Sequence, residues 1–312
     1  MSLLTVGTMA FDDLETPRGR AEMIVGGANT YICLSASYFT KDIEAVSVVG
    51  GDFPDAVMND LRERGVDLSG VQIKEDEKSF YWKGRYHDNM NARDTLDTQL
   101  NVLADFDPVL PDSYKDAEYV MLGNLTPAVQ MRVLEQMTTR PKIVAMDTMN
   151  FWMDIAMEEL KQVIAKVDIL IINDEEARQL SGDYSLVNAA KTIHAMGPKN
   201  LVIKKGEHGA LLFQKNDDTD DSRIFFAPAL PLAEVFDPTG AGDTFAGGFM
   251  GYVAKTGKFD FENMKRAIIY GSALASFCVE KFGIERLTEL SQEDIDERVQ
   301  RFVDLTKFDV EL

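Results

Sequence analysis

The chain has 312 residues, of which 45% are hydrophobic and 27% are charged, and its formal net charge is −20. The composition is ordinary for a globular protein, and the length suits one large domain spanning residues 1–312. The acidic balance argues against nucleic acid and anionic membranes as partners, because both require a basic binding surface.

The cysteines and the absence of targeting signals bear on where the protein works. The two cysteines, Cys33 and Cys278, lie in apolar segments, which indicates buried free thiols and a reducing compartment. No signal peptide or long apolar run stands out in the sequence. We therefore expect a cytoplasmic protein.

Two aspartates follow the first predicted strand, which covers residues 3–7. Asp12 and Asp13 come shortly after this strand, and ligands bind at the carboxyl ends of strands in open α/β sheets. A solvated turn explains the two aspartates equally well.

A glycine pair opens the next predicted helix. After a polar segment at 14–24 that could form a hairpin, Gly26 and Gly27 precede Asn29 and a helix over 30–39. Two adjacent glycines let a ligand lie against the backbone, although a plain strand-to-helix turn also uses them.

A repeating order of apolar strand, turn and helix runs through most of the chain. It predicts strands at 45–49, 119–122, 143–146, 169–172 and 201–205, and helices at 54–64, 127–138 and from 174 onward. This rhythm is typical of parallel sheets with helices on both faces. We therefore expect a doubly wound, mostly parallel α/β fold.

One segment breaks this rhythm. Residues 79–87 alternate between two faces as an amphipathic strand that no helix follows. We expect a small antiparallel sheet outside the main layer, built from segments at about 14–25 and 74–100. Arg93, in the turn that follows, could reach a substrate or a phosphate, or could be solvated.

Two segments place acidic side chains at the start of helices. Asn173 ends an apolar strand, and Glu176 falls in the first helical turn, where acids also favour the helix dipole. The run Asp237–Phe249, DPTGAGDTFAGGF, is a tight Gly-rich turn that leads into a helix ending near Gly257. The free N–H groups of such a helix start hold anions.

Asp243 lies in this helix start and has two interpretations. It could simply cap the helix. Beside an anion site, it could instead remove a proton from a hydroxyl that attacks phosphorus. The pair Gly247 and Gly248 destabilises a helix interior by about 1 kcal/mol per residue relative to alanine, so it needs a packing or ligand reason.

The Gly-rich run resembles the C-terminal signature of the PfkB (ribokinase-like) family of sugar and nucleoside kinases, and further similarity extends over about residues 6–287. The resemblance implies transfer of the γ-phosphoryl group of ATP to a CH₂OH hydroxyl of a ribonucleoside or sugar. Asp243 would be the base, and the backbone amides of Gly240, Ala241 and Gly242 would stabilise the charge on the transferring group.

The resemblance also implies roles around this centre. Asp12 or Asp13 would hold substrate hydroxyls together with Gly26, Gly27 and Asn29, and the small sheet would form a lid. Tyr31 occupies the slot in which the family usually has an asparagine. Nucleotide contacts would come from Asn173, Lys205, Gly206, Gly209, Gly240, Gly242 and Gly283. Asn173 and Glu176 would hold Mg²⁺ through water, and Asp237 and Thr239 would bind a monovalent cation such as K⁺.

Several alternatives remain on the sequence alone. Aromatic residues favour a nucleoside over a bare sugar; they are Phe11, Tyr31, Phe80, Trp82 and Tyr86. A strict sugar kinase of the ribokinase or fructokinase type is the alternative substrate class. A dinucleotide-dependent oxidoreductase is a weaker alternative, because this sequence lacks the early GxGxxG motif of that class. The intact Asp243 argues against a non-catalytic sensor. The lid aromatics could also form a homodimer contact.

Overall fold

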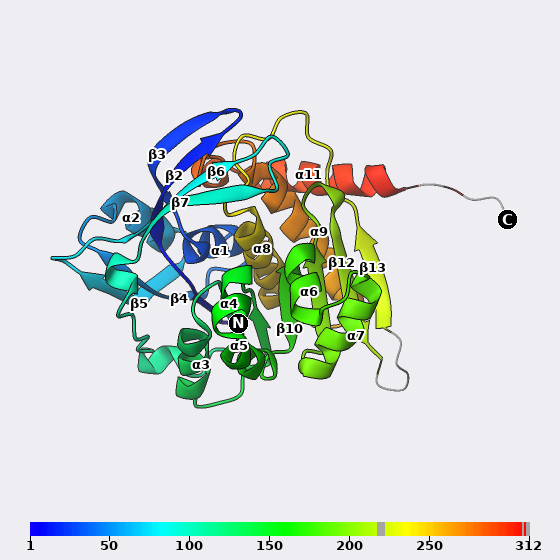
Figure 1. Ribbon diagram of the computed structural model, residues 1–312, viewed down its shortest axis with the longest axis horizontal. Coiled ribbons are helices and arrows are strands. Elements are labelled where there is room, and N and C mark those ends of the chain that lie inside the picture. Colours follow the sequence, from blue (N-terminus) through cyan, green and yellow to red (C-terminus); the bar gives the residue numbers. More distant parts are fainter. Residues whose placement is uncertain (217–221, 308, 310–312) are drawn as a thin grey trace.

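The structure, a computed structural model, describes residues 1–216, 222–307 and 309. Within them, nine strands form the main sheet in the order β13-β12-β11-β10-β9-β8-β1-β4-β5 (Figure 1). These strands are β1 Leu3–Val6, β4 Ile43–Gly50, β5 Val66–Lys74, β8 Tyr119–Leu122, β9 Ile143–Met146, β10 Ile169–Asn173, β11 Asn200–Lys204, β12 Ala210–Lys215 and β13 Ser222–Ala227. Neighbouring strands pair in parallel along the order β11-β10-β9-β8-β1-β4-β5. At the other edge, β12 pairs antiparallel with β11, and β13 pairs antiparallel with β12.

Helices cover both faces of this sheet. One face packs against α1 Ala28–Ala36, α2 Asp55–Glu63, α8 Ala241–Thr256 and α9 Phe261–Cys278. The other packs against α3 Pro127–Gln136, α4 Asn150–Ile155, α5 Met157–Ile164, α6 Asp174–Ser181 and α7 Leu186–Met196. Successive strand residues such as Ile171 and Ile172 enter opposite cores, which explains the continuous apolar runs. The predicted doubly wound fold is confirmed.

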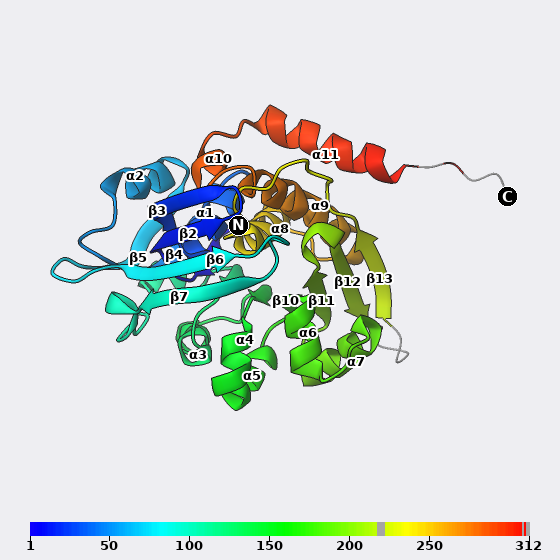
Figure 2. The same ribbon diagram turned by 45° about the horizontal axis from the view of Figure 1, so that its top comes forward.

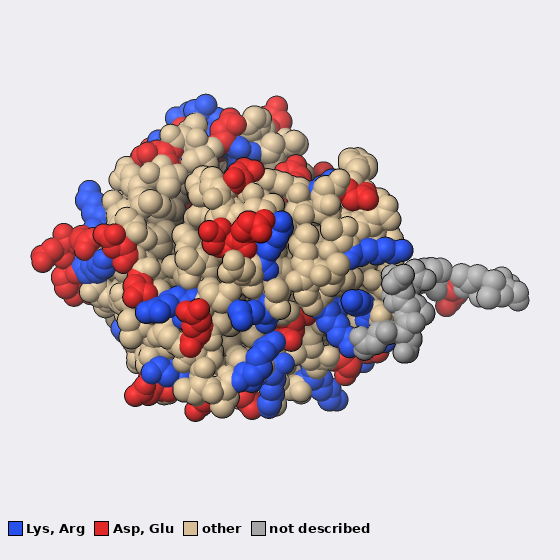
Figure 3. Space-filling view, turned by 60° about the horizontal axis from the view of Figure 1, so that its bottom comes forward, with Lys and Arg blue, Asp and Glu red and all other residues tan. Residues whose placement is uncertain are grey.

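The remaining helices lie beside α9. They are α10 Glu285–Thr288 and α11 Gln292–Thr306, which both contact α9. Short 3₁₀ turns cover Asn101–Leu103, Asp112–Tyr114 and Gly206–His208. Within the described part of the chain, no helix combines the length and apolarity needed to cross a bilayer. Figure 3 shows acidic and basic side chains interspersed over one face of the molecule.

A second, four-stranded sheet lies near the start of α8 (Figures 1 and 2), in the order β3-β2-β6-β7. Its strands are β2 Ala10–Thr16, β3 Gly19–Gly26, β6 Phe80–Tyr86 and β7 Arg93–Gln99. The separate small sheet is confirmed, but the expectation that it is purely antiparallel is wrong. β2 and β6 pair in parallel, and the connection between them runs through β3, α1, β4, α2 and β5, which supplies the long crossover that a parallel pair needs.

The packing of α8 explains its glycine pair. A Cβ atom on Gly247 would lie 2.4 Å from the carbonyl oxygen of Ile32 in α1. Gly247 therefore lets α1 and α8 approach closely, which is the packing reason that the sequence required. The helix ends at Gly257, whose φ of 66° is left-handed, as predicted.

Candidate functional site

The turn before α8 has the geometry of an anion cradle. Gly240 is the N-cap with a φ of 74°, and a Cβ atom there would lie 2.3 Å from the ring of Tyr31. The amide of Ala241 bonds to the carbonyl oxygen of Pro238 at 3.3 Å. The N–H groups of Gly242 and Asp243 follow at the positive end of the helix dipole, where intrahelical acceptors are lacking. The helix start can therefore receive a phosphoryl group.

Asp237 holds this turn in place. Its carboxylate accepts hydrogen bonds from the backbone N–H of Thr239 at 2.8 Å and of Gly283 at 2.9 Å. Gly283 has a φ of 57°, which favours glycine. Asp237 thus ties the segment after α9 to the turn before α8, and both segments carry predicted nucleotide or cation contacts.

Asp243 is half-buried in the first turn of α8. Burial, followed by the nearby carboxylate of Asp147, raises its pKa to about 7, while Lys204 and Arg93 act in the opposite direction. A carboxylate that titrates near neutral pH is suited to accept a proton from a hydroxyl and to release it again.

Asp12 and Asp13 point to opposite faces of β2, as successive strand residues do. Asp12 is 4% exposed and lies against Gly26, where a Cβ atom would be 2.0 Å from its Oδ2. Burial, followed by Asp237 and Asp243, raises the pKa of Asp12 to about 8. Asp12 therefore faces the α8 turn and lies in strand β2, so the solvated-turn interpretation is wrong for this residue.

Asp13 faces the other way. Its Oδ1 accepts a hydrogen bond from the backbone N–H of Met23 at 2.7 Å, and its Oδ2 lies 3.7 Å from the ammonium of Lys83. These contacts stabilise the β2–β3 hairpin and leave Asp13 outside the cluster of carboxylates around α8.

The glycine pair is placed near the site, but Asn29 is not. Gly27 has a φ of 88° and no room for a side chain, since a Cβ atom would lie 2.6 Å from the carbonyl oxygen of Thr8. The Asn29 side chain is fully buried and donates to the carbonyl oxygen of Val46 at 3.3 Å. The structure thus places Asn29 in the core rather than at the site.

Tyr31 packs beneath the α8 turn. It is 1% exposed, and its hydroxyl is buried without a hydrogen-bond partner among the described residues. Its ring supports Gly240 from below. The aromatic residue that replaces the expected asparagine therefore shapes the anion cradle from the core side.

Asn173 and Glu176 form a capping box at the start of α6. The backbone N–H of Asn173 donates to Glu176 Oε2 at 2.7 Å, and the N–H of Glu176 donates to Asn173 Oδ1 at 2.8 Å. Burial, followed by Asp147, raises the pKa of Glu176 to about 7. No group of three or more His, Cys, Asp or Glu side chains that could hold a metal ion occurs in the described ranges.

The predicted nucleotide loop joins β11 to β12. The N–H of Lys205 donates to the carbonyl oxygen of Gly209 at 2.7 Å, which closes a turn that contains Gly206 with a φ of 54°. A Cβ atom on Gly206 would lie 2.7 Å from Oδ1 of Asn91, in the loop between β6 and β7. The nucleotide loop and the small sheet therefore meet.

A buried ion pair that the sequence interpretation did not use lies between these elements. Lys204 Nζ is 2.9 Å from Asp147 Oδ2, and the two side chains are 17% and 7% exposed. Burial lowers the pKa of Lys204, but Asp147, Glu176 and Asp243 outweigh it, and the net pKa is raised. Lys204 ends β11 and Asp147 directly follows β9. Their places at the carboxyl ends of parallel strands are the feature of the sequence from which a contact between them could have been predicted.

The inner face of the small sheet covers this centre. Trp82 pairs with Asp12 in register, and its ring lies over Gly84. The guanidinium of Arg93 is 5.9 Å from the centre of the Trp82 ring. The charge of Arg93 partly offsets the raised pKa values of Asp243 and Glu176.

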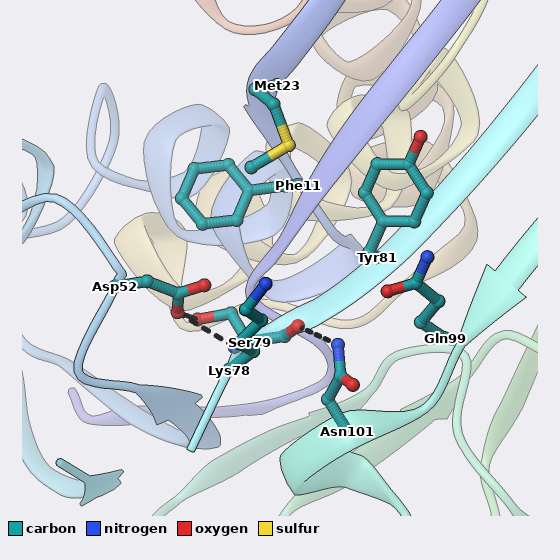
Figure 4. A pocket seen from close by; sticks show the side chains of 8 residues that line it. All are labelled: Phe11, Met23, Asp52, Lys78, Ser79, Tyr81, Gln99 and Asn101. Carbon is teal, nitrogen blue, oxygen red and sulfur yellow. Dashed lines mark hydrogen bonds between the residues drawn. The ribbon is translucent and has the colours of Figure 1, made fainter. Parts of the chain in front are cut away.

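The outer face of the same sheet lines a separate cavity of about 260 Å³ (Figure 4). Phe11 and Tyr81 pair in register and contribute rings to it, and Met23 lies above them. Two of the aromatic residues considered from the sequence, Trp82 and Tyr86, thus belong to the inner face, whereas Phe11 belongs to the outer one.

Comparisons with known proteins bear on the family and the fold. Residues 5–289 match the model of the pfkB family carbohydrate kinase. The cytidine kinase of Thermococcus kodakarensis is 29% identical over 256 residues, which cover 80% of this chain and 87% of the relative. The nucleoside kinase of Methanothermobacter thermautotrophicus is 27% identical over 328 aligned positions, covering 96% and 95%. The solved nucleoside kinase of Methanocaldococcus jannaschii superposes with a TM-score of 0.74 at 20% identity, covering 96% of this chain and 99% of that structure.

Proposed function

The chain belongs to the pfkB family of carbohydrate kinases, and from this premise we propose that it transfers the γ-phosphoryl group of ATP to a primary hydroxyl of a ribonucleoside. The observation that carries the proposal is the position of Asp243, a carboxylate with a pKa near 7 in the first turn of a helix whose free amides form an anion cradle. A strict sugar kinase is the alternative.

The reaction follows from this geometry. Asp243 accepts the proton of the acceptor CH₂OH group while the hydroxyl oxygen of that group forms a bond to the γ-phosphorus. The bond from the γ-phosphorus to the β,γ-bridging oxygen breaks, and ADP leaves. The backbone amides of Gly240, Ala241 and Gly242 stabilise the charge on the transferring group. Of these three, the amide of Ala241 also donates to the carbonyl oxygen of Pro238.

Asp12 is the proposed ligand of the substrate hydroxyls. It faces the α8 turn and lies against Gly26, whereas Asp13 and Asn29 are engaged elsewhere. Gly27 completes this side through its backbone. A carboxylate that accepts two neighbouring hydroxyls is typical of ribose and sugar binding, so Asp12 serves both substrate classes.

We propose that the nucleotide binds between the β11–β12 loop and the segment at Gly283. Lys205, Gly206 and Gly209 form one wall. Asn173 and Glu176 would hold Mg²⁺ through water, where it supplies positive charge to the phosphates. Asp237 and Thr239 would bind K⁺ beside the turn. Equal rates in Na⁺, K⁺ and a bulky organic cation would contradict this cation site.

The choice of a nucleoside rests on two observations. The two nucleoside-kinase relatives align over most of both chains, and the half-buried Trp82 lies on the inner face beside Asp12. Stacking of a base on an aromatic ring contributes roughly 1–3 kcal/mol. A bare pentose gains less from the same ring.

The test is an ADP-release assay with cytidine, adenosine, inosine, ribose and fructose derivatives, with the Asp243→Asn variant as the blank. We expect the highest kcat/KM with a nucleoside. Trp82→Leu should raise KM for that nucleoside by about ten-fold and change KM for ribose little. Preference for a free sugar would establish the sugar-kinase alternative, and no turnover with any acceptor would indicate a binding protein.

The outer face of the small sheet supports a further proposal, a homodimer through this sheet. Met23 is 55% exposed there, next to the cavity that Phe11 and Tyr81 line. A second copy of the chain would cover the exposed Met23 side chain. Sedimentation of the wild type and of Met23→Glu should give a dimer and a monomer, whereas a monomeric wild type would contradict the proposal.

A further inference from the structure

Lys204 is a buried cation at the centre of the site. It is the last residue of β11, and β10 separates it from β9, which Asp147 follows. Its side chain is 17% exposed, and Asp147 Oδ2 lies 2.9 Å from its Nζ. A lysine ammonium has three donors. Among the described residues, Asp147 is its only hydrogen-bond acceptor.

The ammonium points at the anion cradle. A Cβ atom built on Gly242 would lie 2.9 Å from Lys204 Nζ. The nitrogen therefore lies directly beside the backbone of Gly242, whose N–H group belongs to the free amides of the first α8 turn. An anion bound by those amides would also be within reach of the two remaining ammonium donors.

A purely structural role explains this arrangement less well. A buried ion pair contributes little net stability, because the loss of hydration offsets the attraction between the charges. An exposed lysine–carboxylate pair also occurs away from the site, between Lys142 and Glu118, which directly precede β9 and β8, with 2.6 Å between Nζ and Oε1. The pair between Lys204 and Asp147, however, faces Gly242. The carboxylates of Asp243 and Glu176 also favour the charged form of Lys204.

We propose that Lys204 is a catalytic residue that binds the transferring phosphoryl group of ATP, with Asp147 as the positioning residue that holds its ammonium beside Gly242. The inference rests on the proposed function. Lys204 supplies a fixed positive charge where negative charge develops in the transition state, together with the amides of the α8 turn.

The experiment measures kcat and nucleotide binding for Lys204→Met, using the nucleoside that the wild type phosphorylates best. Removal of one preorganised donor typically lowers kcat by about 10²–10³. We expect this loss, and we expect affinity for a non-hydrolysable ATP analogue to fall more than affinity for ADP. Lys204→Arg should recover part of kcat because it keeps the charge.

Lys142→Met is the control, since it also removes a lysine from a carboxylate pair, here at the residue that directly precedes β9, and its turnover should stay near the wild-type value. Lys204→Met leaves the buried carboxylate of Asp147 unpaired, which could prevent the protein from folding. In that case the double variant Lys204→Met, Asp147→Asn removes the unpaired charge and should show the same loss of kcat. Turnover within about three-fold of wild type, or equal losses of ATP-analogue and ADP affinity, would overturn the role of Lys204. A wild type without turnover would instead overturn the proposed function.

Discussion

The hydroxyl of Tyr86 lies 3.1 Å from Thr239 Oγ1. Tyr86 ends β6 in the small sheet, and Thr239 belongs to the Gly-rich turn before α8. This hydrogen bond therefore joins the sheet that covers the site to the turn that carries the anion cradle.

Tyr86→Phe should lower kcat/KM by a few-fold, because the sheet loses its bond to the turn. A neutral hydrogen bond contributes about 1 kcal/mol, so the melting temperature should change little. Steady-state kinetics and thermal melts measure the two effects. The exposed Tyr184 provides the control Tyr184→Phe. Identical kinetics for both variants would show that the bond has no role in closing the site.

Asp243→Asn should lower kcat by about 10²–10⁴, the usual contribution of a general base. Asparagine keeps the volume, and the N-cap of α8 is Gly240 rather than Asp243, so the fold should remain. ATP affinity should hold or rise slightly because a negative charge beside the phosphates is lost.

The control for Asp243 is Asp260→Asn, at the N-cap of α9, where the carboxylate accepts a hydrogen bond from the N–H of Asn263 at 2.9 Å. This variant removes a carboxylate from the start of another helix and should keep near-normal turnover. The N-cap of α8 is Gly240, so the structure excludes the capping interpretation of Asp243. If Asp243→Asn also retained turnover within a few-fold of wild type, Asp243 would not be the base.

Activity and stability should respond to pH in opposite directions. Burial raises the pKa of Asp243 to about 7 and of Asp12 to about 8, well above the values in an unfolded chain. The base must be deprotonated, so kcat/KM should rise as pH increases through about 7.

Stability should fall over the same range. Between about pH 4 and pH 8 the folded state binds more protons than the unfolded state at Asp12 and Asp243, so the free energy of unfolding decreases as pH rises. Urea melts at a series of pH values measure this decrease, and Asp12→Asn should flatten it. A flat profile for the wild type would contradict the raised pKa values.

Glu176→Gln should increase the Mg²⁺ concentration required for half-maximal rate, because it removes charge from a residue that would hold the ion through water. Loss of such an outer partner typically weakens metal binding by about 10–100-fold. Glutamine can still accept the hydrogen bond from Asn173 N–H, so the capping box should persist. The exposed neighbour variant Glu175→Gln is the control, and matching Mg²⁺ titrations for the two would argue against the role.

Local patterns in the sequence were sufficient for the parts of the molecule that local chemistry determines. The Gly-rich turn, the helix from it to Gly257 and the place of Asp243 depend on backbone freedom and helix capping within a few residues. The strand and helix order predicted the doubly wound sheet, because buried parallel strands need continuous apolar runs. The helix start capped by Asn173, with Glu176 in its first turn, could likewise be predicted from neighbouring residues.

Tertiary structure alone decided which residues meet at the site. Asp12 and Asp13 are neighbours in sequence, but the pairing of β2 with β3 and β6 turns only Asp12 toward α8. Asn29 has a suitable side chain, yet helix α1 directs it into the core. Lys204 and Asp147 are 57 residues apart and contact each other because parallel strands end at the same edge of the sheet. Such contacts depend on the register and facing of distant strands, and a single sequence does not encode these in any local pattern.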